Sequence, residues 1–403
     1  MKNLIYRIGI DKTIFYMLMT RGFGAISSFV TILMLGVFLT KSEIGYYYTF
    51  ASIIGLQVFF ELGFSVVLRQ YMSHLNANVI FYNNLPFTTE LNRGDIISLY
   101  VFSKKWYFKL AIVLAFFLLL SGWLFFNNEL SDVNWKFPWL CLTILTAISL
   151  TYTPILSTIE SLGFVLEVSK LRYIQILISS VISWIVIYFG GGLYCTLVMP
   201  IVTIVVNFFW INKHFKKLLL FFNTKHTTNR KWFSEMFEMQ GKVAISWVFG
   251  YLIFQIINPI SFKLYGSEIS GQIGLTLSIF SLMLNMSLSW INTKMPYWGR
   301  LIAKKEAGIF YKLFLETLKQ SSVFLIFIEM FFILFVFFIV KKIDLSFYEK
   351  LLPIDLMLLL AITMISRHVV GSIGYYIRVH KKEKLVFNAI ITSVVMIGLF
   401  YLI

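Results

Sequence analysis

Charged and amide side chains recur at helical spacing inside stretches of the chain that are otherwise apolar. In residues 46–72 the polar positions Gln57, Glu61, Ser65 and Arg69 follow one another every four residues, so a helix would carry them on one face. An ionisable group near the middle of a bilayer costs about 2.5–3.5 kcal/mol on insertion scales, and such groups usually face a cavity or one another. These positions are therefore predicted to line a transport cavity.

The same reasoning selects residues in other apolar stretches. Glu160 ends a strip of serine and threonine residues, in which Pro154 is predicted to kink the helix. Arg21 and Arg367 lie in opposite halves of the chain, and two buried guanidinium groups suit an anionic substrate because they bind phosphate oxygens in a bidentate way. The full set of candidate substrate-binding or transport-cavity residues is Arg21, Glu61, Arg69, Glu160, Gln255, Asn258, Asn285, Asn292, Arg367 and His368.

Each of these residues also has a structural interpretation. Ser, Thr and Asn side chains commonly hold membrane helices together, at roughly 0.6–2 kcal/mol per hydrogen bond. Glu61 can neutralise Arg21 or Arg69 as a structural ion pair, and Glu329, alone on an aromatic helix, is interpreted as a helix-packing residue. The sequence has no metal-ligand cluster, nucleophile elbow or nucleotide-binding loop, so neither an enzyme nor a metal site is predicted.

Long apolar segments must position these side chains. With 59% hydrophobic and 13% charged residues, the composition excludes a soluble protein. Residues 95–107 are predicted to lie in the headgroup plane as an amphipathic lead-in to the third span. About eleven spans are predicted, each long enough to cross roughly 30 Å of hydrocarbon, at 13–39, 46–72, 107–126, 138–162, 172–190, 192–212, 242–264, 271–294, 320–340, 353–377 and 384–403.

The distribution of basic residues supports this division and sets the orientation. Connections on the side of Met1 carry 27 of the 35 Lys and Arg residues. By the positive-inside rule, the chain is predicted to be a multi-pass protein of the bacterial inner membrane, with a cytoplasmic N-terminus and, after an odd number of spans, a periplasmic C-terminus. Anionic headgroups then account for the net charge of +16, and no nucleic-acid partner is predicted.

A repeated tripeptide, Ser-Glu-Ile, divides the chain into halves. Ser42-Glu43-Ile44-Gly45 lies between the first two spans, and Ser267-Glu268-Ile269-Ser270 lies between spans seven and eight, 225 positions later. The repeat predicts two pseudo-symmetric lobes of the same orientation around a central cavity. Their predicted bounds are 1–212 and 242–403, with a cytoplasmic linker at 213–241. A complete second half would need a twelfth helix.

Several short motifs resemble one family of membrane transporters. They are Ser42–Tyr47 with Glu61-Leu62-Gly63 and Arg69, Lys105-Trp106-Tyr107, Glu160–Gly163 with Glu167, Arg172 and Gln175, and Pro296-Tyr297-Trp298. Together they resemble the polysaccharide and O-antigen repeat-unit flippases of the multidrug/oligosaccharidyl-lipid/polysaccharide exporter superfamily. The resemblance covers the chain to about residue 320, and this family usually has twelve helices.

The resemblance implies transport, not catalysis. The implied activity is translocation of undecaprenyl-pyrophosphate-linked oligosaccharide repeat units across the inner membrane by alternating access, for surface polysaccharide and lipopolysaccharide biosynthesis. The family's charged cavity carries over best to Arg21, Glu61 and Arg69. The implied partners are the lipid-linked oligosaccharide, membrane lipids, a polysaccharide polymerase and a chain-length regulator. No cofactor is implied, and a proton or sodium gradient is the candidate energy source.

Two other functions remain open at this point. A multidrug exporter of the same superfamily would share the fold, but it would favour an acidic, aromatic-lined cavity, whereas Arg21 and Arg367 favour an anion. A membrane glycosyl polymerase or ligase would need an extracytoplasmic catalytic loop, and the longest predicted external connections have about a dozen residues. The sequence does not indicate which glycan would be carried.

Overall fold

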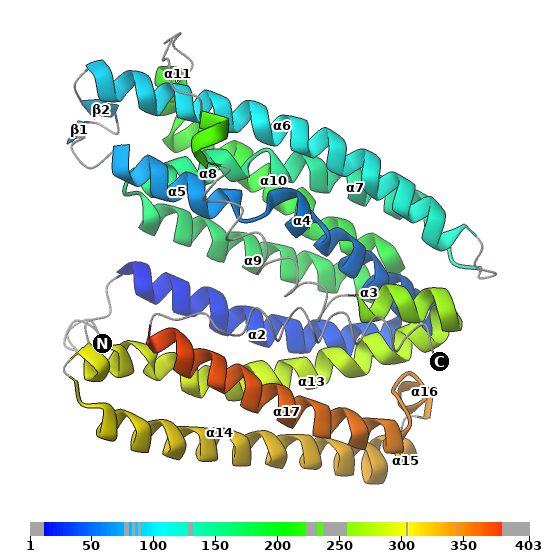
Figure 1. Cartoon of the computed structure of the whole chain (residues 1–403). Coiled ribbons are helices and arrows are strands. Elements are labelled where there is room, and N and C mark those ends of the chain that lie inside the picture. Colours follow the sequence, from blue (N-terminus) through cyan, green and yellow to red (C-terminus); the bar gives the residue numbers. More distant parts are fainter. Residues whose placement is uncertain are drawn as a thin grey trace. The chain divides into compact units, whose positions relative to one another are not determined.

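The fold is almost entirely helical (Figure 1). The computed structural model describes residues 12–75, 80–82, 85–87, 90–127, 132–222, 232–236, 256–303, 305–343 and 345–380. One short antiparallel hairpin pairs β1 (Ile80–Tyr82) with β2 (Leu85–Phe87), with Ile80 opposite Phe87. Apart from this hairpin, the predicted all-α membrane fold is confirmed.

Eight helical segments of the described residues are long and apolar enough to cross a membrane. They correspond to the predicted spans one, three to six and eight to ten, and they make the chain a multi-pass membrane protein. Most of predicted span seven (242–264) and all of span eleven (384–403) lie outside the described residues. The number of eleven spans therefore stays a prediction.

The predicted second span is not one continuous helix. It consists of α3 (Lys41–Gly55), α4 (Gln57–Glu61) and α5 (Phe64–Leu75). Between α4 and α5, Leu62 and Gly63 have φ angles of 45° and 71°, in the left-handed region that ends a right-handed helix and that leucine seldom adopts. A continuous helix over 46–72 is thus wrong, and Glu61 is the last residue before the break.

The third and fourth spans differ from one another in continuity. α6 runs unbroken from Glu90 to Phe126, so the prediction that residues 95–107 lie flat in the headgroup plane is wrong, because they continue along the axis of the spanning helix. In the fourth span, α7 (Lys136–Leu150) and α8 (Thr153–Ser161) are separated by a turn directly before Pro154. Proline has no N–H and its ring displaces the preceding turn, so the predicted kink is confirmed.

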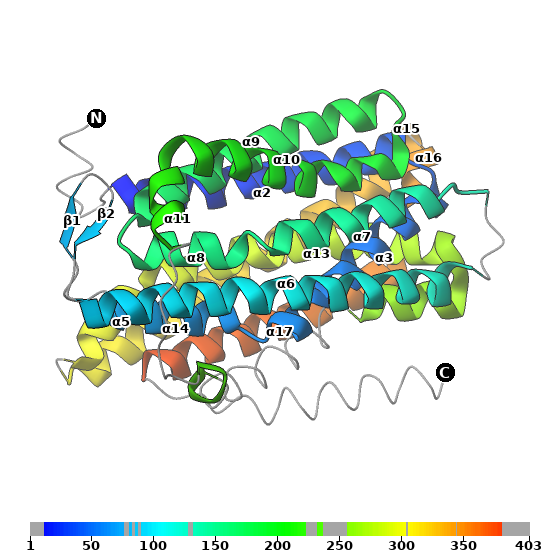
Figure 2. The ribbon, with the colours of Figure 1, turned by 90° about the horizontal axis from the view of Figure 1, so that it is seen from above.

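The chain forms two compact units. The first comprises the described parts of 1–27 and 50–255, and it contains α4 to α8, α9 (Val165–Tyr188), the short helix η1 (Gly192–Tyr194), α10 (Cys195–His214) and α11 (Lys216–Phe222). Within this unit α6 lies along α7, and α9 lies along α10 (Figure 2). The N-terminal part of α2 (Lys12–Phe38) packs on α9, where Tyr16 and Phe23 contact the Tyr173 ring edge-on.

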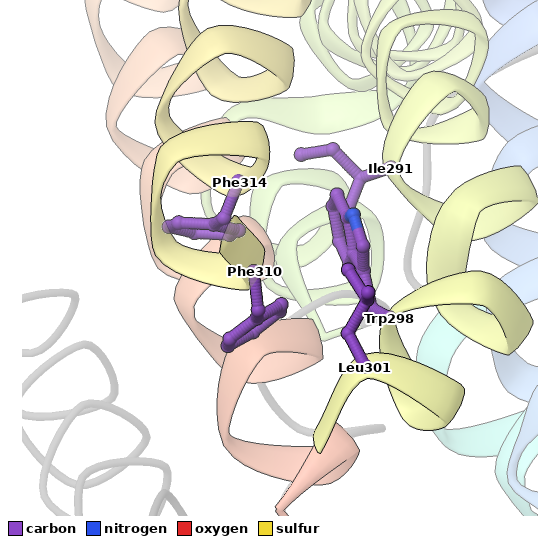
Figure 3. Packing of buried hydrophobic residues seen from close by; sticks show 5 residues of the cluster. All are labelled: Ile291, Trp298, Leu301, Phe310 and Phe314. Carbon is purple, nitrogen blue, oxygen red and sulfur yellow. The ribbon is translucent and has the colours of Figure 1, made fainter. Parts of the chain in front are cut away.

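The second unit is built on three helices, α13 (Ile257–Ala303), α14 (Ala307–Phe335) and α17 (Ile354–Val379). Between α14 and α17 lie the π-helix η2 (Val336–Val340), α15 (Lys341–Ile343) and α16 (Leu345–Tyr348). Figure 3 shows part of the core, in which Trp298 of α13 packs its ring 5.8 and 5.7 Å from the rings of Phe310 and Phe314 of α14. These contacts hold α13 and α14 together.

The second unit also includes residues 28–49, which the predicted lobes assign to the first half. The repeated motifs explain this grouping, because they pack backbone against backbone. A Cβ atom at Gly45 would lie 1.9 Å from the carbonyl oxygen of Ser267, and one at Gly271 would lie 2.3 Å from that of Lys41. Small residues let two membrane helices approach in this way, and α13 bends at Gly266 (φ 82°) just before the contact.

Hydrogen bonds and an ion pair join the connection between α14 and α17 to α2, α3 and α13 near the repeated motifs. Lys350 is buried and its Nζ donates to the Gly36 carbonyl of α2 at 2.9 Å. Its neighbour Glu349 forms an ion pair with Lys41 at 3.1 Å, with its own side chain 52% exposed. The amide of Gln272 donates to the Glu349 carbonyl at 2.7 Å. These bonds join residues 341–353 to the start of α3 and to α13.

Candidate functional site

Glu160 holds two arginines from neighbouring helices of the first unit. Its Oε1 lies 2.9 Å from Nη2 of Arg172 on α9, and its Oε2 lies 3.4 Å from Nη1 of Arg69 on α5. The carboxylate is buried, at 8% exposure, whereas the Arg69 and Arg172 side chains are 36% and 46% exposed. The cluster therefore carries one net positive charge, and each guanidinium keeps part of its donor fork accessible.

The helix breaks place this cluster. α8 begins after the turn at Thr151 and Tyr152 and packs against α5, and α5 begins after the break at Leu62 and Gly63. Both short helices are thus free to take directions that a continuous span would not allow. Glu160, on the last turn of α8, comes within reach of Arg69 on α5 and of Arg172 on the first turns of α9. From the sequence, Arg69 was considered as an ion-pair partner of Glu61. In the structure, Arg69 forms an ion pair with Glu160.

Glu61 has a different partner. The hydroxyl of Tyr107, a buried residue of α6, donates to its Oε1 at 2.9 Å. Glu61 is half-buried and lies at the end of α4, next to the left-handed Leu62. A charge-assisted hydrogen bond of this kind is about twice as strong as a neutral one. It fixes the carboxylate at the point where the helix is interrupted.

Tyr107→Phe is expected to lower the free energy of unfolding by about 1.5–3 kcal/mol, since it removes the donor to a carboxylate. Glu61→Gln keeps a carbonyl acceptor for the same hydroxyl and is expected to cost less stability than Tyr107→Phe, while transport is lost with the charge. Thermal unfolding in detergent, together with a transport assay, checks both variants. A Glu61→Gln protein that melts well below Tyr107→Phe would favour the structural ion-pair interpretation of Glu61.

A second buried polar pair joins α9 to α10. The side-chain amide of Gln175 donates to Oδ1 of Asn207 at 2.7 Å, and both residues are buried. Gln175 belongs to one of the motifs found in the sequence, whereas Asn207 was not selected. Because the pair is enclosed by the two helices, it fits the helix-packing role that such polar residues commonly have in membranes.

The candidates of the second unit are dispersed. His368 of α17 is buried, and its Nδ1 lies 3.3 Å from the Ser322 hydroxyl of α14. Arg367 is half-buried and donates to Met364 Sδ on its own helix at 3.6 Å. Asn258 is buried near the start of α13, and its carbonyl accepts from Ser270 at 3.2 Å. Asn285 is exposed on α13.

The three remaining candidates are Gln255, Asn292 and Arg21. Gln255 and the side chain of Asn292 lie outside the described residues. Arg21 is exposed on α2 in the part of the helix that belongs to the first unit, whereas Arg367 belongs to the second. A joint role for these two arginines stays a prediction.

Glu329 lies on the face of α14 that packs in the second unit, at 1% exposure. Among the described residues, neither of its carboxyl oxygens has a hydrogen-bond partner. The same holds for Nε2 of His368. An unsatisfied buried polar group costs about 1–3 kcal/mol, so the interior of this unit is less stable than a fully apolar one would be.

Two residues that bind the candidate carboxylates of the first unit were not among the candidates from sequence. Arg172 and Tyr107 both occur in motifs noted there, but each lies outside the polar strips that the four-residue spacing selects. Tyr107 looks like an interfacial aromatic residue beside Lys105 and Trp106. A buried carboxylate must be paired. Where its own helix offers no basic or donor residue within reach, a partner on another helix is expected.

Solved structures provide a comparison for the whole chain. One, described as an inward-facing conformation of a multidrug resistance MATE family transporter of the MOP superfamily, has a TM-score of 0.56 at 10% sequence identity and covers 94% of this chain and 85% of that one. The chain has the MATE transporter fold. Another, described as MATE in the straight conformation, has a TM-score of 0.46 at 11% identity, covering 97% of this chain and 95% of that one.

No protein-family model and no curated protein matches the sequence. The likeness is therefore one of MATE fold. The structure at TM-score 0.56 is described as a member of the MOP superfamily, the superfamily that the sequence motifs resemble. The finer part of that resemblance, the polysaccharide-flippase branch, stays a prediction.

Proposed function

We propose that this chain is a secondary transporter whose cargo is an anionic amphiphile, specifically an undecaprenyl-pyrophosphate-linked oligosaccharide moved between leaflets by alternating access. The observation that carries the proposal is the cluster of Arg69, Glu160 and Arg172, in which one buried carboxylate orients two partly exposed guanidinium groups. Guanidinium forks match the oxygens of a pyrophosphate. The remaining positive charge balances part of the charge of such a headgroup.

The physical task fits a transporter of this fold. A sugar–pyrophosphate head does not cross hydrocarbon unaided, whereas its polyprenyl tail stays in the bilayer while the head moves through the protein. Arg21 and Arg367 are proposed as further contacts to the anionic head. The proposed energy source is a proton or sodium gradient, because the sequence has no nucleotide-binding motif.

Multidrug export is the second candidate, and the comparison with solved structures by itself favours it. The structure at TM-score 0.56 is described as a multidrug resistance transporter. The two candidates differ in the charge of the cargo, since cationic drugs would be repelled by a cluster with a net positive charge. An experiment that compares an anionic cargo with a cationic one therefore distinguishes the two candidate functions.

Arg69→Ala with Arg172→Ala is expected to abolish display of surface glycan when the gene is expressed in a flippase-deficient strain that the wild type restores. Lysine at both positions should recover only part of the display, because an ammonium group keeps the charge and loses the planar fork. Protein in the membrane fraction is quantified for each variant. Resistance of a drug-sensitive strain to cationic dyes is measured in parallel, and no gain is expected.

Increased dye resistance without restored glycan would contradict the proposal and support multidrug export. Normal glycan display by the double alanine variant would remove the two arginines from the mechanism. Glu349→Gln serves as a control for the loss of an ion pair, because it removes the carboxylate that pairs with Lys41 in the other unit.

A further inference from the structure

A groove of about 920 Å³ opens on the first unit between α6 and the α7–α8 break. Its α6 wall includes Lys104, Lys105 and Lys109, and its other wall includes Ile148, Tyr152 and Ile155. The turn at Thr151 and Tyr152 that separates α7 from α8 lines the same groove. The three lysines of α6 thus face a mostly apolar wall at the point where the fourth span is interrupted.

The three lysines are available to a ligand. All three are exposed, and among the described residues none of them forms an ion pair with a carboxylate. Uncompensated ammonium groups beside an apolar wall favour a ligand with a negative charge. Lysine binds phosphate as a point charge and does not require one fixed geometry.

The depth of the groove indicates where this ligand lies. From Lys109 to Phe126, α6 extends about 26 Å at 1.5 Å per residue, close to the roughly 30 Å of hydrocarbon in a bilayer. The lysines therefore lie at one boundary of the hydrocarbon, at the level of lipid headgroups. A ligand held there by its charge would have its remaining length in the membrane.

An apolar track continues from the lysines toward the other end of the helices. On α6, Ile112 and Phe116 are 58% and 71% exposed, one and two turns beyond Phe108. On α7, Ile144 and Ile148 are 45% and 43% exposed and also lie one turn apart. Two parallel rows of exposed apolar side chains on neighbouring helices suit a hydrocarbon chain lying along them.

We propose that this groove is a binding site for an anionic membrane phospholipid. Its phosphate is held by Lys104, Lys105 and Lys109, and one acyl chain lies along the apolar track between α6 and α7. This site is separate from the Arg69–Glu160–Arg172 cluster and does not depend on which cargo is transported. A phospholipid headgroup is the phosphate source that the bilayer itself supplies at this depth.

The test uses the full-length protein in detergent and native mass spectrometry. Phosphatidylglycerol and phosphatidylcholine with identical dioleoyl chains are titrated separately. The wild type is expected to bind phosphatidylglycerol at least about tenfold more tightly than phosphatidylcholine, given about 1 kcal/mol, or fivefold, per basic residue near a charged lipid. Lys104→Gln, Lys105→Gln and Lys109→Gln combined should remove this preference.

The matched control changes three other exposed lysines, Lys213, Lys216 and Lys217, to Gln. It removes the same charge from α10 and α11, at lysines that do not line the groove, and should leave the preference within about twofold of the wild type. Equal loss in both triple variants would overturn the site, because it would show non-specific attraction by net charge. Equal binding of the two lipids by the wild type would overturn it as well.

Two further measurements sharpen the result. Ile155→Trp narrows the groove and keeps all three lysines, so it should weaken binding of phosphatidylglycerol without changing net charge. Undecaprenyl phosphate is titrated in the same way. Binding of undecaprenyl phosphate together with failure of phosphatidylglycerol to bind would overturn the proposal, because the groove would then be a site for a polyprenyl lipid. Neither outcome bears on the glycan-display test of the arginine cluster.

Discussion

Gly45→Ala is expected to destabilise the second unit. Its cost should exceed that of a methyl group added to a helix of this unit at a position with no atoms nearby. The new Cβ would lie 1.9 Å from the carbonyl oxygen of Ser267, a backbone atom that cannot turn aside as a flexible side chain can. α3 and α13 would have to separate. Overpacking at this level costs about 3 kcal/mol, and thermal unfolding of the purified protein measures it.

Two variants test the cause. Gly271→Ala, whose Cβ would lie 2.3 Å from the Lys41 carbonyl oxygen, should cost nearly as much. The double variant should cost clearly less than the sum, because one separation of the helices relieves both contacts. Gly308→Ala is the control, since nothing lies within 4 Å of its Cβ position, and it should be neutral or stabilising by up to about 1 kcal/mol. Additive costs would argue against a shared contact.

Glu160→Gln is expected to lower the free energy of unfolding by about 1.5–3 kcal/mol, the range for hydrogen bonds to charged groups. The substitution keeps the shape of the side chain, but it leaves Arg69 and Arg172 facing each other without the carboxylate between them. Their mutual repulsion should turn both forks toward solvent. Transport is therefore expected to fall with stability, as measured by thermal unfolding and by glycan display.

Glu349→Gln is the matched control for this substitution. It breaks an ion pair whose carboxylate side chain is 52% exposed, and exposed pairs contribute about 0.2–1 kcal/mol. Adding Arg172→Gln to Glu160→Gln should restore part of the lost stability, because it removes one of the two like charges. If Glu160→Gln unfolds at the same temperature as Glu349→Gln, the arginines do not depend on Glu160 for their position.

Much of the fold could be predicted from the sequence, because bilayer thickness and backbone hydrogen bonding leave few choices. Apolar length and the distribution of basic residues located the spans that the structure describes. Pro154 marked the kink, since its effect on a helix is local. Glu160 was selected as an ionisable residue that ends a polar strip, and this too is a property of one helix.

The rest depends on contacts between helices and on one unusual residue. Leu62 has a left-handed backbone that its residue type does not indicate, and only the neighbouring Gly63 hints at the break. The partner of Glu61 is Tyr107, 46 positions away, and Arg172 reaches Glu160 from another helix. The repeated motif was found, but its contact with its own copy was not. Pairings of this kind follow from helix packing, which single-sequence patterns do not specify.

The contact between Gly45 and Ser267 also orders events during biosynthesis. A nascent membrane protein enters the bilayer from its N-terminus, and its parts begin to fold in that order. Gly45, near the start of α3, is therefore in the membrane long before the ribosome has made Ser267 of α13, 222 positions further along. During this interval Gly45 does not yet have its contact with Ser267. Because residues 28–49 belong to the second unit, this unit cannot be complete until α13 has been made.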